Sequence, residues 1–305
     1  MNESGSKKVI AIDLGGTKIH AAIIEEDKNI IAEKKIATDK KNSPNSIVNS
    51  LYDLIHEMLS YSDVDKIGIA SAGRINSVEG KVFFATDNLP GWTGVNLKDL
   101  IEKEFNIDTV VENDVNAAGL GEQWNGNAKN YNSTVCLTLG TGIAASIIIN
   151  RELMRGSHWS AGEVGHMIIH PDGILCNCGL KGCFEQYCSG TALVKKYNII
   201  SEKKIMTGEE FFKLVDLKDI NAINILDEFT SDLALSIINL SNIIDPDAFI
   251  IGGGLINTRD YWWDDFISKV NNSSLAEIFM PIILPSKLDN YSGLFGAAYL
   301  ALNNV

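Results

Sequence analysis

The amino-acid sequence contains no run of about 20 apolar residues, the length that a membrane-spanning helix requires. It also contains no low-complexity segment and no linker-like stretch among its 305 residues. The segment from Met1 to Lys8 is polar and leads directly into an apolar run, so we expect no signal peptide. These absences predict a cytoplasmic protein without a membrane partner.

Basic residues are scarce relative to acidic ones. The chain has 26 Lys and Arg against 39 Asp and Glu, which gives a formal net charge of −13. Binding to a nucleic-acid backbone requires a clustered basic surface, so we expect no nucleic-acid partner. A single bound nucleotide is still compatible with this charge, because it needs only local hydrogen-bond donors. At roughly 150 residues per domain, the length predicts two domains.

Cysteine is limited to five residues, at positions 136, 176, 178, 183 and 188. An odd number of cysteines, with four of them close together, does not fit a secreted disulfide framework. The spacing instead indicates a metal site or a thiol cluster. We expect Cys136 and Cys188, which lie outside the tight group, to be small buried residues.

Hydrophobic periodicity predicts alternating strands and helices, and therefore an α/β fold. The step Ser43-Pro44 is typical of a helix N-cap followed by proline at the first helical position. Strands are expected at 9–13, 19–24, 30–36, 66–70, 109–111, 134–139, 143–149, 248–251 and 282–284. Helices are expected at 44–59, 97–105, 116–124, 221–243 and 292–302.

One pattern occurs twice along the chain. A strand, a turn of glycine and threonine and a second strand begin near residue 9 and again near residue 134. Glycine hairpins of this kind are common, but the repeat also predicts a duplicated unit with two α/β halves. The expected lobes are 1–118 plus 290–305 and 119–289, with a cleft between them.

Three glycine turns follow buried strand patterns, at 15–17, 140–142 and 252–254. Glycine lets backbone N–H groups approach phosphate oxygens, although one such turn alone is usually only a tight turn. The Walker A and GxGxxG spacings are both missing, which excludes the standard P-loop and dinucleotide-binding motifs.

A set of motifs in fixed order resembles the ROK (repressor, open reading frame, kinase) family of sugar kinases. The match extends from about Ile10 to the closing helix, and its motifs are Asp13–Lys18, Glu112–Ala118, Leu139–Gly142, Ala161–His166, Cys176–Glu185, Ser189-Gly190 and Gly252–Gly254. The resemblance implies an actin/hexokinase-like (ribonuclease H-like) duplicated two-lobe fold. It also implies ATP and a sugar bound in the cleft, and a homodimer.

The resemblance implies that Asp114 is the catalytic base, which accepts the proton of the sugar 6-hydroxyl as it attacks the γ-phosphate of ATP. The Asn113-Asp114 pair taken alone is also typical of a helix N-cap. Asp13 is expected near Mg²⁺, and its alternative role is to accept from the N–H groups of its own turn. The residues implied for ATP and Mg²⁺ binding are Asp13, Gly15, Gly16, Thr17, Lys18, Gly140, Thr141, Gly142, Gly252, Gly253 and Gly254. Those implied for sugar binding are Gly73, Arg74, Thr86, Asn113, Glu163, His166 and Glu185.

The tight cysteine group and one histidine predict a structural Zn²⁺ site formed by His166, Cys176, Cys178 and Cys183. One imidazole and three thiolates make a closed tetrahedral set that leaves no position for water. Buried free thiols are the alternative. The ion would hold the loop that carries Glu163 and Glu185. One departure from the family is Ile143-Ala144-Ala145, which stands where glycines are usual and leaves the tightness of nucleotide binding open.

The sequence therefore predicts an ATP-dependent kinase for the 6-hydroxyl of a hexose or N-acetylhexosamine. The segment 72–92 slightly favours N-acetylmannosamine over glucose, and N-acetylglucosamine stays open. A ROK-type sugar-responsive repressor is one alternative, disfavoured by the net charge and by the few residues ahead of the first strand. A non-catalytic sugar-binding protein is the other, disfavoured by the intact Asn113-Asp114 pair.

Overall fold

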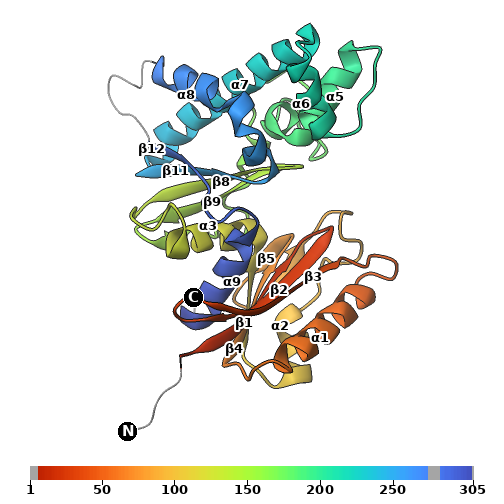
Figure 1. Cartoon of the computed structure of the whole chain (residues 1–305), viewed down its shortest axis with the longest axis vertical. Helices are drawn as coiled ribbons and strands as arrows, with labels where there is room; N and C mark the ends of the chain where they lie inside the picture. Colours follow the sequence, from red (N-terminus) through yellow and green to blue (C-terminus); the bar gives the residue numbers. More distant parts are fainter. Residues whose placement is uncertain (1–5, 274–281, 304–305) are drawn as a thin grey trace. The chain divides into compact units, whose positions relative to one another are not determined.

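The computed structural model describes residues 6–273 and 282–303 and divides the chain into two compact units. Unit 1 comprises Met1–Asn130, Ser146–Ala161 and Lys287–Val305, and unit 2 comprises Tyr131–Ala145 and Gly162–Ser286 (Figure 1). The lobe boundaries expected at 118 and 290 remain a prediction about the domains.

Unit 1 is built on a five-stranded sheet with the order β3-β2-β1-β4-β7. Strand β1 pairs antiparallel with β2 and parallel with β4, which pairs parallel with β7. The strands of this unit are β1 (Lys8–Leu14), β2 (Lys18–Glu25), β3 (Ile30–Ala37), β4 (Lys66–Ser71), the hairpin β5 (Arg74–Asn76) and β6 (Lys81–Phe84), β7 (Thr109–Asn113) and the short β10 (Glu152–Leu153). Its helices are α1 (Asn45–Leu59), α2 (Leu97–Phe105), α3 (Asp114–Asn125) and α9 (Ser292–Asn303).

Strand β1 is apolar on both faces because helices cover both faces of its sheet (Figure 1). Successive side chains of a strand point to opposite faces. Ile10 and Ile12 belong to the hydrophobic cluster that includes residues of α1 and α2. Val9 and Ala11 belong to the cluster formed with α3 and α9. This two-sided burial explains the continuous apolar runs that the sequence shows.

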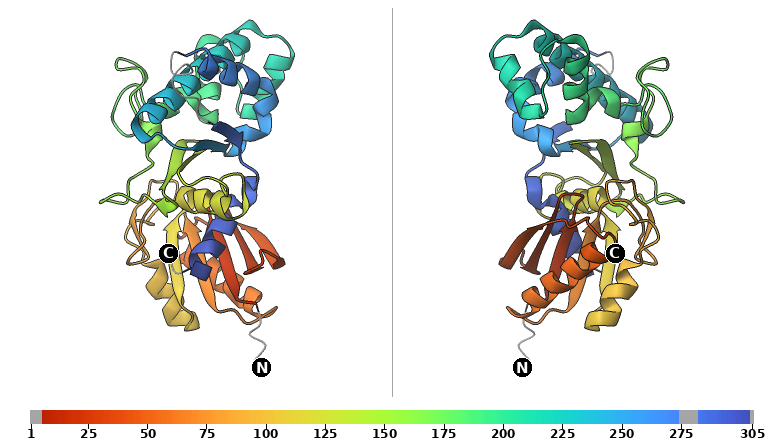
Figure 2. Two further views of the ribbon diagram at one scale, coloured as in Figure 1. Left: turned by 90° about the vertical axis from the view of Figure 1, so that its left-hand side faces the viewer. Right: turned by 90° about the vertical axis from the view of Figure 1, so that its right-hand side faces the viewer.

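Helices α3 and α9 pack backbone against backbone, and both views of Figure 2 show them side by side. A Cβ on Gly296 of α9 would collide with the carbonyl oxygen of Ala117 on α3. A Cβ on Gly121 of α3 would collide in the same way with the carbonyl oxygen of Ser292. Glycine at these two positions therefore sets the distance between the helices.

Unit 2 contributes most of a second five-stranded sheet, whose order is β10-β9-β8-β11-β12. Strand β11 pairs parallel with β8 and with β12, and β10 pairs antiparallel with β9. The two sheets therefore share one connection order, which confirms the predicted duplication. The strands are β8 (Thr134–Leu139), β9 (Ile143–Ile149, which belongs to unit 1 from Ser146 onward), β11 (Ala248–Gly252) and β12 (Ile282–Pro285). The helices are α4 (Glu185–Cys188), α5 (Gly190–Ile200), α6 (Gly208–Asp216), α7 (Ile220–Ile244) and α8 (Trp263–Asn271), with 3₁₀ turns at Val164–His166, Gly254–Tyr261 and, in unit 1, Asp289–Tyr291.

The long helix α7 has a clear local cause at each end. Asp219 caps its N-terminus, because its carboxylate accepts hydrogen bonds from the N–H groups of Asn221 and Ala222. Asp245 ends it in a left-handed conformation with φ of 49°. Phe229 of α7 packs edge-on against the buried Trp262 in the core of unit 2.

The start of α1 corrects one sequence-based prediction. The helix begins at Asn45, so Pro44 occupies the cap position that we expected for Ser43, and no side chain caps the first turn. The other predicted strands and helices lie where the periodicity puts them. In the described part of the chain, no helix combines the length and the hydropathy that crossing a bilayer would require.

Candidate active site and metal centre

The carboxylate of Asp13 lies at the end of β1 beside the first turn of α9. A Cβ placed on Gly293 would be 3.0 Å from the carboxylate carbon of Asp13, so glycine there leaves room for this group. Burial, and secondarily the negative charge of Asp114, raise the pKa of Asp13 to about 7, while Lys18 acts in the opposite direction. A cation at this carboxylate would favour its ionised form, as the predicted Mg²⁺ role requires.

The turn after β1 is held by its own backbone and by β3. The N–H of Gly15 donates to the carbonyl of Lys18 at 3.0 Å, and the Thr38 hydroxyl donates to the carbonyl of Gly15 at 2.8 Å. Thr17 is exposed at the tip of this turn. The ammonium of Lys40 would be 3.8 Å from a Cβ on Gly16, so a positive charge lies near the turn. Sequence reasoning did not single out Lys40, because twenty-odd residues separate it from the turn.

The Asn113-Asp114 pair lies where β7 ends and α3 begins. The side-chain oxygen of Asn113 accepts from the N–H of Asn116 at 2.9 Å, so the N-cap interpretation is correct for this residue. Its amide nitrogen donates to the carbonyl of Gly73 at 2.8 Å and to Asp114 at 2.9 Å. Asp114 is half-buried in the first turn of α3, where the helix dipole favours a negative charge. The cap therefore fixes both side chains in place.

Glu112 and Arg155 form a buried ion pair directly behind this pair. The Glu112 side chain is 2% exposed and its Oε2 lies 2.6 Å from Nε of Arg155. Its other oxygen accepts from the N–H of Asn113 at 2.9 Å and from the amide of Asn116 at 3.0 Å. We assigned neither Glu112 nor Arg155 a role from the sequence. The signal available was a glutamate that directly follows the strand predicted at 109–111.

The three remaining candidates of unit 1 lie around the β5–β6 hairpin. Gly73 has φ of 104°, a conformation that favours glycine, and its carbonyl contacts Asn113 as described above. The guanidinium of Arg74 lies 5.7 Å from the ring centroid of Phe84. Thr86 is exposed beyond the hairpin. The structure therefore brings Gly73 into contact with Asn113.

In unit 2, the turn at 140–142 lies against the N-terminus of α5. The N–H of Gly140 donates to the carbonyl of Gly142 at 3.0 Å, and the N–H of Gly190 donates to the carbonyl of Gly140 at 2.8 Å. Thr141 is exposed at the tip. The N-terminus of α5 therefore lies beside an exposed turn, and helix N-termini favour anions.

The third glycine turn, at 252–254, meets the second one. Gly253 has φ of 85°, and a Cβ there would collide with the backbone of Leu139, which directly precedes the 140–142 turn. Nothing would lie within 4 Å of a Cβ on Gly254, so the turn opens there. The structure thus places two of the three predicted phosphate turns side by side in unit 2.

The segment Ile143-Ala144-Ala145 takes the place of the usual glycines without pointing its bulk into the turn. Ile143 and Ala145 are buried in the core of unit 2, and only Ala144 is half-exposed. Gly162 and Gly165 pack against the carbonyl oxygens of Ala145 and Ile143, respectively, where a Cβ would collide. The loop that carries Glu163 is therefore held against β9.

Glu185 joins this loop region to the turn. Its Oε2 accepts a hydrogen bond from the N–H of Ile143 at 3.0 Å. The predicted sugar-binding carboxylate therefore contacts the backbone that follows the 140–142 turn. Glu163 Oε2 lies 3.8 Å from Nε2 of His166, so these two predicted sugar-binding side chains also lie together.

The predicted metal ligands converge. One ligand atom from each of the four residues, the Sγ atoms of three cysteines and a ring nitrogen of His166, lies within 4.8 Å of the others. Nδ1 of His166 is 3.7 Å from Sγ of Cys176, and the Sγ atoms of Cys178 and Cys183 are 3.6 Å apart. Tetrahedral coordination with Zn–S bonds of about 2.3 Å requires sulfur–sulfur separations of about 3.8 Å. The donor set therefore fits Zn²⁺, and Nδ1 is the nitrogen that would bind it.

The backbone around the cluster is sharply bent. Gly179 and Gly182 have φ of 90° and 77°, which allows the short loop to bend back on itself. The amide of Gln186 donates to Sγ of Cys176 at 3.6 Å. Cys136 and Cys188 are buried outside the cluster, as expected.

Comparisons with known proteins agree with this picture. A family model described as ROK family matches residues 9–304. The chain is 33% identical to the glucokinase of Streptomyces coelicolor, with 96% of each chain covered. It is 29% identical to the xylose repressor of Bacillus spizizenii, over 97% of this chain and 77% of the repressor.

Solved structures give the same result. A ROK family glucokinase from Streptomyces griseus, in complex with glucose and AMPPNP, has a TM-score of 0.81 at 32% identity and covers 97% of this chain and 99% of its own. Lmo2764 from Listeria monocytogenes, a putative N-acetylmannosamine kinase, has a TM-score of 0.85 at 28% identity, with coverage of 96% and 97%. These likenesses confirm the predicted actin/hexokinase-like α/β fold.

Proposed function

The chain belongs to the ROK family, and on that premise we propose that it is an ATP-dependent kinase for the 6-hydroxyl of a hexose or N-acetylhexosamine. The observation that carries the proposal is the arrangement at the start of α3. There Asn113 caps the helix and donates to Asp114, and the buried Glu112 holds the backbone of Asn113. A carboxylate fixed in this way is suited to accept a proton from an alcohol.

In the proposed reaction, Asp114 accepts the proton of the sugar 6-hydroxyl while that oxygen attacks the γ-phosphate. Phosphoryl transfer depends mainly on positioning and on stabilising charge, so the position of the proton acceptor affects the rate more than its basicity does. Mg²⁺, when bound, neutralises charge on the phosphates. Asp13, with a pKa raised to about 7, would hold it, either directly or through water. ATP binding is assigned to the 15–18, 140–142 and 252–254 segments.

Recognition of the sugar is assigned to Asn113 and to three side chains of unit 2. Glu163, His166 and Glu185 offer oxygen and nitrogen atoms that accept from, or donate to, ring hydroxyls. His166 would bind Zn²⁺ through Nδ1 and leave Nε2 toward Glu163. We assign Gly73, Arg74 and Thr86 to the same sugar as a weaker part of the proposal. The Zn²⁺ role is structural, because the four ligands leave no open coordination position.

For the substrate, we propose N-acetylmannosamine slightly ahead of glucose. The segment 72–92 supports the former, and the similarity to glucokinases supports the latter. We also propose a homodimer, on the basis of the family. A coupled ATP assay with a panel of hexoses and N-acetylhexosamines decides the substrate, since only the correct sugar will combine low KM with high kcat.

The Asp114→Asn variant tests the catalytic assignment. The amide keeps the size of the side chain but cannot accept the proton, so we expect kcat to fall by about 10²–10⁴-fold. Sugar affinity by calorimetry and Zn²⁺ content should stay at the wild-type level, which serves as the control for folding. Turnover near that of the wild type would refute Asp114 as the base.

The similarity to xylose repressors favours a second candidate, a sugar-responsive DNA-binding regulator. The net charge of −13 and the intact Asn113-Asp114 pair favour the kinase. A gel-shift experiment with and without sugars separates the two. A protein that binds sugar but neither transfers phosphate nor shifts DNA would instead be a sugar-binding protein.

A further inference from the structure

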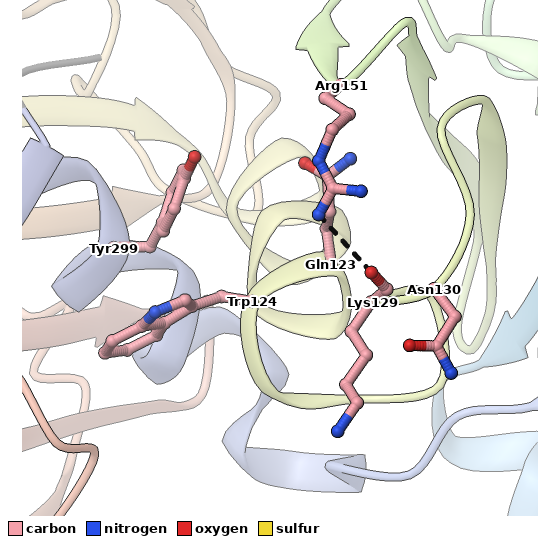
Figure 3. Close-up of a pocket in the computed structure, with 6 residues that line it drawn as sticks. All are labelled: Gln123, Trp124, Lys129, Asn130, Arg151 and Tyr299. Atoms are coloured by element: carbon pink, nitrogen blue, oxygen red, sulfur yellow. Dashed lines mark hydrogen bonds between the residues drawn. The ribbon is translucent and has the colours of Figure 1, made fainter.

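A small pocket in unit 1 lies away from the residues assigned to catalysis. Its volume is about 270 Å³, and it is lined by two cations, two amides and two aromatic side chains: Lys129, Arg151, Gln123, Asn130, Trp124 and Tyr299 (Figure 3). They come from the end of α3 and the segment after it, from the residues between β9 and β10, and from α9. Three separate segments of the chain therefore build one concave polar surface.

The pocket is too far from Asp114 to take part in phosphoryl transfer. Asp114 is the first residue of α3, and Gln123 lies two and a half turns further along the same helix. At about 1.5 Å per residue, this places Gln123 about 14 Å from Asp114 along the helix axis. A ligand here would occupy a second site.

Gln123 is the first sign that the pocket takes a ligand. The residue is only 5% exposed, and its amide nitrogen has no hydrogen-bond partner among the described residues. A buried N–H₂ group without a partner is costly, and native proteins rarely keep one without a reason. Gln123 is one of the residues that line the pocket, so a ligand that enters it would meet this side chain (Figure 3).

The charge of the pocket is the second sign. Arg151 and Lys129 both line it, and the guanidinium of Arg151 donates to the carbonyl of Lys129 at 3.3 Å, which keeps this cation at the pocket. A third cation, Lys28, lies 5.2 Å from the ring centroid of Trp124 and donates to its carbonyl. Lys28 is not a lining residue and the Lys129 ammonium points away from Arg151 in Figure 3, so Arg151 is the cation that would meet an anion in the pocket.

We propose that this pocket binds a phosphoryl dianion, either inorganic phosphate or the phosphate of a small organic ester. The guanidinium of Arg151 would pair with the negative charge, and the Gln123 amide would donate to one phosphate oxygen. Trp124 and Tyr299 provide an apolar wall on which the carbon part of an ester could pack. The volume is below the about 300–1,000 Å³ of pockets for drug-sized ligands, which favours a small ligand.

Calorimetric titration with two probes tests the proposal, using inorganic phosphate and glucose 6-phosphate. The protein is first saturated with sugar and AMPPNP, so that the proposed catalytic site is filled. Loss of a charge-assisted hydrogen bond in Arg151→Ala should raise the Kd at least about tenfold. The matched control, Lys103→Ala, removes an exposed cation from α2 and should leave Kd unchanged. Tighter binding of glucose 6-phosphate identifies an ester site, and equal binding a phosphate site.

Gln123→Leu provides a test that does not depend on the cations. Because it removes an unsatisfied buried amide, the variant should fold and should melt no earlier than the wild type. It should also lose most of the rise in melting temperature that the two probes give to the wild type. The proposal is wrong if neither probe binds the wild type at millimolar concentration, or if Arg151→Ala and Gln123→Leu both bind as well as the wild type. Neither measurement requires turnover.

Discussion

Replacing Arg155 by methionine should destabilise unit 1 and slow catalysis at the same time. In the structure, Nε of Arg155 lies 2.6 Å from a Glu112 carboxylate whose side chain is 2% exposed. Methionine keeps much of the apolar stem but leaves that carboxylate buried without its counter-charge. Breaking a buried pair typically costs about 3–5 kcal/mol. Arg155 is 24% exposed and two N–H donors remain on Glu112, so we expect a cost of about 3 kcal/mol at the lower end of that range.

The effect on catalysis follows from the same contacts. The Glu112 carboxylate accepts from the N–H of Asn113 and from the side-chain amide of Asn116. If that carboxylate moves toward water in Arg155→Met, Asn113 will move with it, and Asp114 is the next residue. Misplacement of about 1 Å can reduce kcat by about 10²-fold. Arg155 is thus a positioning residue, and we expect kcat to fall more than sugar affinity changes.

Urea unfolding and steady-state kinetics of a double-mutant cycle provide the assay. Glu112→Gln retains an acceptor for Asn113 and removes the negative charge. The double variant Glu112→Gln/Arg155→Met should therefore lose about 1–3 kcal/mol less stability than the two single losses added together. Arg155→Lys is the matched control, because it keeps the positive charge and should recover part of the stability. A cost below about 1 kcal/mol for Arg155→Met, or strict additivity in the cycle, would show that the ion pair does not hold this site.

Three further predictions concern other parts of the molecule. The pKa of Asp13 is raised from 3.8 to about 7, so the folded state keeps a proton that the unfolded chain releases. The free energy of unfolding should therefore fall as pH rises from 4 to 7 and level off above pH 7. In urea unfolding, Asp13→Asn should lack this dependence and should be more stable than the wild type by as much as about 4 kcal/mol at pH 8. A variant with the same pH profile as the wild type would contradict the prediction. Removal of the proposed Zn²⁺ by a chelator should speed hydrogen exchange in residues 163–185 and weaken sugar binding measured by calorimetry. If the metal-free protein binds sugar as tightly as the metal-bound protein does, the metal has no part in sugar recognition. Gly296→Ala should lower the free energy of unfolding by about 1–3 kcal/mol, because the added Cβ meets the Ala117 carbonyl. This loss should outweigh the higher helix propensity of alanine. A variant that is more stable in urea unfolding would show that α3 and α9 can move apart.

Much of the fold could be predicted from local sequence patterns. The helix expected at 97–105 and the strand expected at 134–139 agree with the structure at both ends, because apolar spacing and a capping Asn96 act within a few residues. The first residue of α1 could not be predicted in this way. Cap geometry depends on backbone angles around Pro44, which residue preferences describe only on average.

The candidate site divides in the same way. The resemblance to the ROK family identified Asp13, Asn113 and Asp114 as candidates, and the cysteine spacing identified four candidate metal ligands, whose ligand atoms the structure brings within 4.8 Å of one another. The roles of these residues in catalysis and sugar binding remain proposals. The sequence did not identify the nitrogen of His166 that faces the cysteines, because the orientation of a ring depends on its neighbours.

The sequence by itself determined the alternation of strands and helices, the duplicated glycine turns and the set of residues able to hold a metal ion. These features depend on contacts between residues close together in the chain, which spacing records directly. Only the tertiary structure decided that Arg155 neutralises Glu112, that Gly296 admits the backbone of α3, and that Gln123 faces a pocket with Arg151. Each of these contacts joins residues that are distant in the chain, and their energies exist only once the folded backbone brings the partners together.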